Sequence, residues 1–411
     1  MKPVGIRSQV KSIHCRGRIP YLCCLWLWLL AGRALSAESG SGVPAMNLLL
    51  PKAQIAVLEN DKFSNETIEA QMTWGTLTNL PVKVRNRGRW SRSWNKTPLK
   101  VFLPNNPVEN RECLNLNSTY RDPSWIRERL AYHVYSIAGV PASKTRFIEL
   151  RLNSKFHGIY VEVEQVDSDF LKSRGFKGAE AYKANGGRHA SDERRLKDEA
   201  AYRGEYEKQT KGKTNYTSLI DFCAALNAAT DVDKFFQERV DLDRYISYLA
   251  ATILTQNWDA LNKNHVLVHD AANSGKWFVV PWDVDRTFGD WPGANSGGSF
   301  NMYRLPVELG IQSSPGVTGW NRLQDRFWKS KPLRLRLARR LEELLATEFT
   351  LERLNPVIDA WAAEIKPGAV QDRTVWGSAS ELDLTEGIRE LKAFIKKRRE
   401  FVLAGLAQLK E

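Results

Sequence analysis

The sequence predicts an α+β fold with two lobes, in which the N-terminal part is rich in β-strands and the C-terminal part is helical. Residues 66–104 alternate polar and apolar side chains, as half-buried strands do. Residues 321–347 and 382–409 are predicted to be helical. At 411 residues with 43% hydrophobic residues, the chain has an ordinary globular composition and is long for a single compact core.

The first 37 residues have the order of a secretory signal peptide. A basic stretch without acidic residues comes first, an apolar run from Leu22 to Ala31 follows, and small residues lead to a cleavage site near Ser36 or Ala37. A membrane anchor is the alternative, but a bilayer-spanning helix needs about 20 apolar residues and this run is about half that length. We therefore expect an exported chain, either periplasmic, at the cell surface or secreted, with no stable membrane span after cleavage.

Charge and cysteine content limit the classes of function. Removing residues 1–37 takes away six Lys or Arg and no Asp or Glu, which lowers the net charge from +13 to +7. The remaining surplus would suit an anionic ligand such as a nucleotide. Only Cys113 and Cys223 would remain, either as one disulfide or as two free buried thiols. The chain contains no CxxC, HExxH, GxSxG or Walker A motif, so zinc, serine-hydrolase and P-loop chemistry lack support.

The central part of the chain predicts a helix followed by a hairpin. Residues 124–138 have a helical apolar stripe with Ser124 as the N-cap. Arg146–Asn153 and Gly158–Val166 both alternate at period two, so we predict two strands joined by a four-residue connection.

The segments that follow alternate between regular elements and loops. Residues 186–215 are rich in Lys, Arg, Glu and Gly and predict a mobile or exposed insertion. The predicted regular elements are a strand at 181–184 and helices at 217–229 and 241–256. Residues 295–318 are a loop rich in Gly and Ser.

The strongest chemical signal comes directly after helix 241–256. Asp259 and Asn264 lie five residues apart in a loop, and a strand, a turn and a return strand then lead to Asp283 and Asp285. The two loops lie at the same end of this predicted hairpin, so their side chains can converge. Oxygen ligands favour Mg²⁺ or Mn²⁺ over zinc, and such an ion usually bridges phosphate oxygens.

This spacing agrees with that of protein kinases. There, a catalytic-loop Asp is followed five residues later by a metal-binding Asn, and a second metal-binding Asp lies beyond a short hairpin. Asp259, Asn264 and Asp283 occupy the corresponding positions. Spacing alone is weak evidence, because Asp259 and Asp283 have an alternative interpretation as turn or cap residues.

Several blocks of the sequence, in order, resemble the spore coat protein H (CotH) kinase family. They span about residues 80–290 and are VKVRNRGRWSRSWNKTPLKVF, LNLNSTYRDPSWIRERLA, GVPASKTRFIELRLNSKFHGIYVEVEQVDSDFLKSRGF, AYKANGG, NWDALNKNH and GKWFVVPWDVDRTFG. The resemblance implies an atypical protein-kinase-like fold that binds ATP with Mg²⁺ (or Mn²⁺) and phosphorylates Ser or Thr of a protein. By motif, Asp259 corresponds to the catalytic residue, and Asn264 and Asp283 to metal ligands, with Asp285 as a further candidate ligand.

The resemblance also suggests residues that bind the nucleotide. The turn at Asn153–Gly158, with Lys155 at its tip, corresponds to a phosphate-covering loop, although NSKFHG contains only one Gly. Lys183 is the candidate phosphate-binding lysine, and a surface lysine on an edge strand is the alternative. Glu164 is its candidate partner, with a solvent-facing carboxylate as the alternative.

A basic block precedes these elements and contains Arg85, Arg87, Arg89, Arg92 and Lys96. It departs from the family pattern Arg-Gly-Asn-Ser-Ser, because residues 85–89 read Arg-Asn-Arg-Gly-Arg. We interpret these residues as structural pairs or as groups that steer phosphates. Nucleic-acid binding through Trp90 and Trp94 is not expected of an exported protein.

Three functions remain for comparison. The leading hypothesis is an exported atypical protein kinase that transfers the ATP γ-phosphate to a protein Ser or Thr, and the joint presence of Asp259, Asn264 and Asp283 favours it. The alternative is a non-catalytic cell-surface or adhesive protein on a kinase-like scaffold, because ATP is scarce outside the cytoplasm. A third possibility is a carbohydrate-active enzyme that uses Asp259 and Asp283 as an acid–base pair.

We divide the chain accordingly into four parts. They are a signal peptide over 1–37, an N-terminal β-rich segment with one helix over 38–140, a kinase-like core with the nucleotide and metal site over 141–310, and a C-terminal helical region over 311–411.

Overall fold

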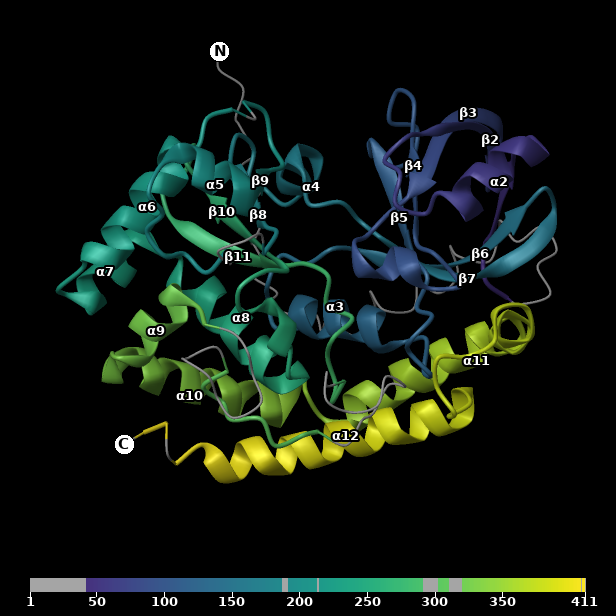
Figure 1. Ribbon diagram of the computed structural model, residues 1–411. Coiled ribbons are helices and arrows are strands. Elements are labelled where there is room, and N and C mark those ends of the chain that lie inside the picture. Colours follow the sequence, from purple (N-terminus) through teal and green to yellow (C-terminus); the bar gives the residue numbers. More distant parts are fainter. Residues whose placement is uncertain are drawn as a thin grey trace, which may run out of the picture.

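The computed structural model has the predicted α+β architecture, with a β-rich N-terminal lobe and a largely helical C-terminal lobe (Figure 1). It describes residues 42–186, 191–212, 214–290, 302–309, 320–407 and 409–410. The predicted signal peptide and most of the predicted loop at 295–318 lie outside the described residues. Among the described residues, no helix is both long enough and apolar enough to cross a membrane.

The N-terminal lobe is a seven-stranded sheet that closes on itself. Its strands are β1 (Ala45–Leu49), β2 (Ile68–Trp74), β3 (Leu77–Asn86), β4 (Leu99–Phe102), β5 (Cys113–Asn117), β6 (Thr145–Leu152) and β7 (Lys155–Val163), in the order β1-β2-β3-β4-β5-β7-β6. All neighbours are antiparallel except β1 and β6, which close the sheet in parallel. The alternation predicted for 66–104 is confirmed in β2, in residues 82–86 of β3 and in β4, where every second side chain is buried, whereas residues 87–98 are not a strand. Helix α2 (Lys52–Asn60) lies beside the sheet (Figure 1).

The β6–β7 hairpin is tighter than predicted. Its turn consists of Asn153 and Ser154, both with positive φ, and Lys155 already pairs with Leu152. Two-residue turns with positive φ match the twist of antiparallel strands. The expected four-residue connection was therefore wrong, because three of its residues belong to β7.

Helix α3 (Arg127–Ile137) connects this sheet to the C-terminal lobe and starts later than predicted. The carboxylate of Asp122 accepts hydrogen bonds from the Arg127 amide at 2.8 Å and from the Ser124 amide at 2.9 Å. Asp122 therefore satisfies the first free amide of the helix, and Ser124 lies before the helix and does not form its N-cap.

The C-terminal lobe contains a four-stranded antiparallel sheet surrounded by helices. The strands, in the spatial order β11-β10-β8-β9, are β8 (Glu180–Ala184), β9 (Tyr206–Lys208), β10 (His265–His269) and β11 (Trp277–Pro281). The helices are α4 (Ser168–Ser173), α5 (Glu199–Glu205), α6 (Thr217–Ala228), α7 (Val232–Arg239), α8 (Leu242–Thr255), α9 (Arg322–Trp328), α10 (Lys331–Thr347), α11 (Leu351–Trp376) and α12 (Leu384–Gly405). Helix α8 runs through the largest core, and α11 and α12 extend beneath both lobes (Figure 1). Cys113 and Cys223 are buried free thiols, one in each lobe.

The exposure predicted for 186–215 holds for only part of the described segment, because residues 197–200 are exposed while others are buried in the fold. Ser191 and Glu193 are buried, and β9 pairs with β8. The Glu193 carboxylate lies 2.8 Å from Nε2 of His265, and the Ser191 amide donates to the carbonyl of Asn262 at 2.9 Å. Buried charged groups are tolerated when they are paired, and here the pairing holds the loop that contains the Asp259 motif.

A buried ion pair joins the two lobes. The Lys96 ammonium contacts the Asp372 carboxylate of α11, and it donates to the carbonyl of Ile159 at 2.6 Å. The same carboxylate accepts from the Ile159 amide at 2.7 Å. At Gly158, with φ of +149°, an added Cβ would lie 2.6 Å from both Asp372 Oδ2 and Lys96 Cε. This close approach of β7 to α11 therefore requires glycine.

His157, next to this pair, provides a pH-sensitive contact. Burial, and secondly the charge of Lys96, lower the pKa of His157 from 6.5 to about 4. Between these values the unfolded chain binds one more proton than the folded chain. The contribution of neutral His157 to the unfolding free energy is therefore fully present above pH 6.5 and decreases as the pH drops towards 4. The loss is at most about 1.4 kcal/mol per pH unit.

We expect His157→Phe to remove this part of the acid sensitivity. Phenylalanine retains a ring opposite Trp376, whose centroid lies 4.9 Å from that of His157, and it has no titratable group. Urea denaturation at pH 7 and pH 4.5 should show a smaller decrease in unfolding free energy for the variant than for the wild type. Equal decreases would assign the acid sensitivity to other groups.

Candidate functional site

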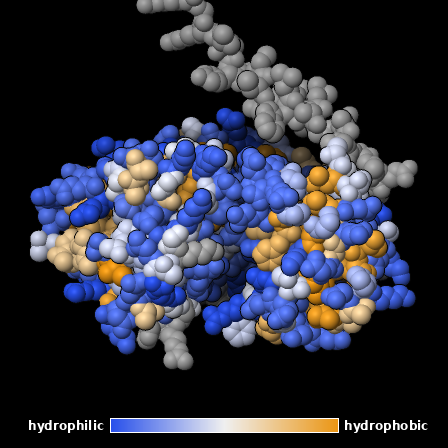
Figure 2. Space-filling model, turned by 90° about the horizontal axis from the view of Figure 1, so that it is seen from above, coloured by the Kyte–Doolittle hydropathy of each residue, from blue (hydrophilic) through white to orange (hydrophobic). Residues whose placement is uncertain are grey.

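The candidate site is a cavity of about 870 Å³ between the two lobes. In the view from above, hydrophilic residues surround a hollow between the lobes (Figure 2). The N-terminal lobe contributes the end of β3, the 3₁₀ turn η1 (Trp90–Ser93) and parts of β4 and β5. The C-terminal lobe contributes β8, the 3₁₀ turn η2 (Trp258–Ala260) and the two ends of the β10–β11 hairpin.

The β10–β11 hairpin brings the predicted motif residues to one edge, as expected. His265 pairs with Pro281, so Asn264 and Trp282 are adjacent, and the Trp282 amide donates to the Asn264 carbonyl at 3.3 Å. Asn264 and Asp283 both adopt left-handed backbone conformations, with φ of 58° and 54°. Asn and Asp tolerate this conformation better than most residues, and here it allows both side chains to lie at the cavity.

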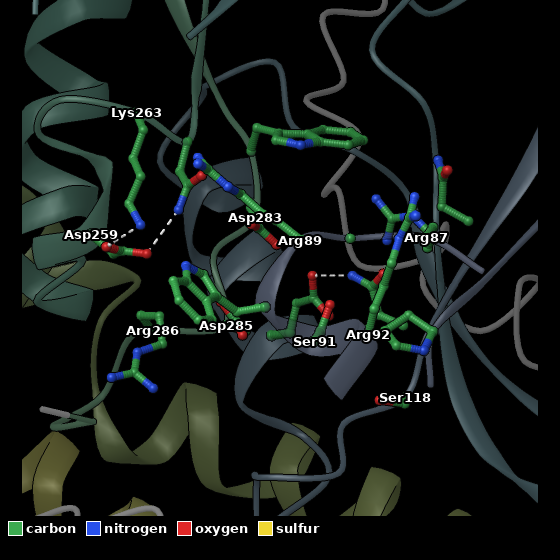
Figure 3. Close-up of a pocket in the computed structure, with 18 of the residues that line it drawn as sticks. Arg87, Arg89, Ser91, Arg92, Ser118, Asp259, Lys263, Asp283, Asp285 and Arg286 are labelled. Carbon is green, nitrogen blue, oxygen red and sulfur yellow. Dashed lines mark hydrogen bonds and ion pairs between the residues drawn. The ribbon is translucent and has the colours of Figure 1, made fainter. Parts of the chain in front are cut away.

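Asp259 interacts directly with two neighbours in its loop. Nδ2 of Asn264 donates to its Oδ2 at 2.8 Å, and Nζ of Lys263 lies 3.1 Å from its Oδ1 (Figure 3). Burial raises the pKa of Asp259, while Lys263 opposes that rise. The predicted pair of Asp259 and Asn264 is therefore in contact. We did not single out Lys263 from the sequence, because a Lys four residues after an Asp is a common pattern.

A second group of carboxylates lies at the end of β11 and on α3. Burial, and then the charges of Asp283 and Glu128, raise the pKa of Asp285 well above its usual value. Burial and Asp283 raise the pKa of Glu128 to about 8, although Nδ2 of Asn117 donates to it at 2.6 Å. Among the described residues, no Lys or Arg forms an ion pair with Asp283 or Asp285. This part of the site therefore holds clustered carboxyl groups whose ionisation is unfavourable without a nearby cation. Glu128 lies on a helix far from the motif in sequence, where no local pattern marked it.

The donor set of Asn264 and Asp283 fits a hard divalent cation. Because Nδ2 of Asn264 donates a hydrogen bond to Asp259, Oδ1 of Asn264 is the atom that can bind a metal. No three His, Cys, Asp or Glu side chains in the described ranges are arranged to hold a metal by themselves. Mg²⁺ does not require this, since it is usually bound by one or two carboxylates together with water and substrate phosphates.

The opposite side of the cavity is basic. Arg87 and Arg92 lie on the N-terminal side of the cavity, across from Asp259, and Arg89 reaches from the same lobe to a place beside Asp283 (Figure 3). Arg92 is fixed by its bonds to the Phe63 carbonyl at 2.7 Å and to Asn65 Oδ1 at 2.8 Å.

Arg87 and Arg89 differ from Arg92. Arg87 and Arg89 form no ion pair with any carboxylate in the described ranges, so their charges are available to a ligand. Of the two interpretations of the basic block, structural pairing holds for Lys96. Arg87 and Arg89 line the cavity, and their role with phosphates stays a prediction.

Two lysines also line the cavity. Nζ of Lys183 on β8 lies 3.9 Å from Oε2 of Glu207 and 5.6 Å from the ring centroid of Trp282. Burial is the main cause that lowers the pKa of Lys183. Lys100 on β4, which the sequence did not distinguish from other strand lysines, donates to Oε1 of Gln165 at 3.4 Å.

The remaining predicted nucleotide residues lie elsewhere. Glu164 pairs with Nη2 of Arg174 at 2.6 Å, so the expected pair with Lys183 is not formed. Lys155 is exposed and does not line the cavity. Its hairpin lies against β1, where the Ser154 amide donates to Oδ1 of Asn47 at 2.7 Å. The segment between β3 and η1, and not this hairpin, faces the motif loops.

Comparison with known protein families finds one family model that matches most of the chain. The family model described as CotH kinase protein matches residues 84–402. Inner spore coat protein H of Bacillus subtilis (strain 168) is 25% identical over 379 residues, which cover 90% of this chain and 100% of that protein.

Two further similarities are more limited. Invasin CotH3 of Rhizopus delemar is 22% identical over 53% of this chain, and the match spans 37% of the invasin. The solved structure of the Helicobacter pylori proinflammatory kinase CtkA covers 76% of this chain and 95% of its own, at 10% identity and a TM-score of 0.36. That TM-score is too low to support an inference about fold or activity.

Proposed function

The chain belongs to the CotH kinase protein family, and we propose that this kinase-like protein transfers the γ-phosphate of ATP to a Ser or Thr hydroxyl of a protein. The observation that carries the proposal is the arrangement of the cavity. The bonded pair of Asp259 and Asn264 lies beside Asp283 and faces arginines that are free to bind phosphates.

Asp259 has the position and chemistry of the group that orients and deprotonates the acceptor. Its carboxylate would accept the hydroxyl proton while the γ-phosphoryl group moves to the acceptor oxygen and ADP leaves. The bonds from Asn264 and Lys263 hold that carboxylate at the cavity edge. The raised pKa of Asp259 brings it nearer to the range in which a carboxylate acts as a general base.

Asn264 and Asp283 would hold Mg²⁺ or Mn²⁺, with Asp285 as a further ligand. The ion, when bound, supplies positive charge to the phosphate oxygens. The uncompensated carboxylates at this edge are the observation that supports a cation here. Arg87 and Arg89 from the N-terminal lobe, and Lys183 from β8 of the C-terminal lobe, would bind phosphate oxygens.

Thermal unfolding with nucleotide tests this proposal. We expect ATP with Mg²⁺ at 100 times its dissociation constant to stabilise the wild type by about 2.7 kcal/mol. Asp283→Ala should lose this stabilisation, because it removes a metal-binding oxygen.

Asp221→Ala is the matched control, since Asp221 is an exposed acid outside the cavity. It should respond like the wild type. A wild type that no nucleotide stabilises in the presence of Mg²⁺ or Mn²⁺ would contradict nucleotide binding at this site.

A non-catalytic adhesive or surface role is the second candidate. It is supported by the invasin relatives and by Trp90, whose side chain lines the rim of the cavity and is 79% exposed. A large exposed aromatic side chain is typical of a binding surface. Stable binding to a protein or glycan without nucleotide binding would favour this role over the first.

We also propose that the protein acts outside the cytoplasm, in a coat or at a cell surface. The N-terminal sequence has the order of a signal peptide. The relatives include an inner spore coat protein and invasins. The physiological acceptor would then be another protein exported to the same place.

A further inference from the structure

We propose that a second cavity binds a small organic anion with a carboxylate or phosphate group, and that this binding alters the Asp283 loop through Tyr132. The cavity has a volume of about 340 Å³ and lies between the β6–β7 hairpin, α3 and α11. It is separate from the candidate site, but α3 contributes to both. Volumes of this size are within the range of small-molecule sites.

The acidic groups of this cavity are already fully occupied. Glu162 accepts from Arg111 at 2.7 Å and from Arg146 at 3.0 Å. Glu109 pairs with the same two arginines, at 2.7 Å and 2.9 Å. This four-residue network is therefore neutral, and it offers no free carboxylate to a cationic ligand.

The donors, in contrast, are incompletely used. Nη2 of Arg146 and Oγ of Ser143 are buried and have no hydrogen-bond partner among the described residues. Ser143 is 95% buried, since its exposed fraction is 5%. The neighbouring Lys144 forms no ion pair with a described carboxylate and acts on Glu109 only at longer range. Unsatisfied buried donors cost free energy, and two such donors beside an unpaired cation have the chemistry that an anionic group satisfies.

The remaining wall includes Trp361 and the arginine packed on it. Arg129 lies 4.2 Å from the ring centroid of Trp361 and 4.4 Å from that of Phe147, and it pairs with Glu364 at 3.5 Å. Its charge is therefore already engaged. The aromatic wall next to the unsatisfied donors suits an organic body attached to the anionic group better than a bare inorganic ion.

Tyr132 connects this cavity to the candidate site. Its side chain lines the second cavity, and its phenolic oxygen accepts a hydrogen bond from the Asp283 amide at 3.1 Å. The side chain is almost fully buried, so it cannot move independently of its surroundings. A ligand that shifts Tyr132 will therefore change the hydrogen bond that holds Asp283. Binding of the anion does not depend on the proposed kinase activity, whereas its effect on phosphate transfer rests on that function.

The binding claim is tested by titrating the full chain with benzoate and, separately, with phenyl phosphate, and measuring the heat of binding. The two arms distinguish a carboxylate from a phosphate ligand. We expect Ser143→Ala combined with Lys144→Ala to weaken binding by about tenfold or more, the effect of losing charged hydrogen bonds.

Lys155→Ala is the control for the loss of one lysine, because Lys155 is exposed and outside both cavities. It should bind as the wild type does. The proposed anion site is contradicted if neither probe binds at probe concentrations up to about 10 mM. It is also overturned if the double variant binds as tightly as the wild type.

The coupling claim is tested by amide hydrogen exchange without nucleotide. Saturation with the bound probe should change the exchange rate of the Asp283 amide by about threefold or more in the wild type. Tyr132→Phe removes the acceptor but keeps the ring, so its Asp283 amide should exchange faster and should not respond to the probe. An unchanged Asp283 amide in the saturated wild type would disprove the coupling. Because ATP is absent, this result is independent of the proposed kinase function.

Discussion

Replacement of Asp259 with Asn is expected to lower phosphate transfer by about 10²- to 10⁴-fold, the usual contribution of a positioned general base. Asparagine has nearly the same shape, so it can keep the contact with Nδ2 of Asn264 through its own carbonyl oxygen. It cannot accept the hydroxyl proton. Binding of ATP with Mg²⁺ should therefore remain close to that of the wild type, because Asp283 and the basic side of the cavity are unchanged.

The measurement is incorporation of γ-labelled phosphate into a Ser-rich protein, made in parallel with nucleotide-dependent thermal stabilisation. Asp221→Asn, an exposed acid outside the cavity, serves as the control and should transfer phosphate like the wild type. Transfer by the Asp259 variant at the wild-type rate would exclude Asp259 as the base. Nucleotide binding with no transfer in the wild type would instead support the non-catalytic role.

Replacement of Asp372 with Asn is expected to lower the unfolding free energy by about 3–5 kcal/mol, the usual cost of breaking a buried ion pair from one side. Lys96 is fully buried and Asp372 nearly so. Burial already lowers the pKa of Lys96, and the charge of Asp372 is the main influence that opposes this. Without that carboxylate, Lys96 must either remain charged without a partner or release its proton.

Chemical denaturation of a variant that replaces both partners separates the cost of a lone buried charge from the effect of the surroundings. Lys96→Met with Asp372→Leu should be less destabilising than Asp372→Asn alone, because the double variant buries no charge. As a control, Asp359→Asn breaks the more exposed contact with Lys392 and should cost less than about 1 kcal/mol. If Asp372→Asn cost no more than this surface change, the pair would not stabilise the joint between the lobes.

The position of Lys96 also gives this pair a role in arranging the candidate site. Lys96 follows η1 in the chain, and the segment before it contains Arg87 and Arg89. Fixing Lys96 to α11 therefore limits the positions that this segment can take over the motif loops. Variants of Asp372 that still fold are expected to bind nucleotide less tightly.

The features that the sequence predicted correctly depend on neighbouring residues. Alternation over 66–104 identified strands of the closed sheet, because side chains alternate between the two faces of a strand. The turn between HVLVHD and KWFVVPW identified the β10–β11 hairpin, and hairpin geometry then required Asn264 and Asp283 to lie at the same end. Asp259 and Asn264 lie in one loop five residues apart, and the structure adds the hydrogen bond between them.

Two predictions that failed wholly or in part concern charged residues whose partners are far away in the sequence. The charged composition of 186–215 suggested solvent exposure, but Glu193 is buried because His265 lies beside it. Glu164 was assigned to Lys183, but the fold places it beside Arg174. Composition describes the residues of one segment, whereas burial depends on whether a distant partner compensates the charge.

By itself, the sequence determined the α+β class, the hairpin that presents Asp259, Asn264 and Asp283, and the resemblance to a kinase family. The tertiary structure alone decided which cations face those carboxylates, that Glu128 joins them, and that Tyr132 holds the Asp283 amide from 151 residues away. The physical reason is the range of the interactions. Periodicity and turn geometry are set by adjacent residues, but ion pairs and buried hydrogen bonds exist only after chain folding brings distant groups together.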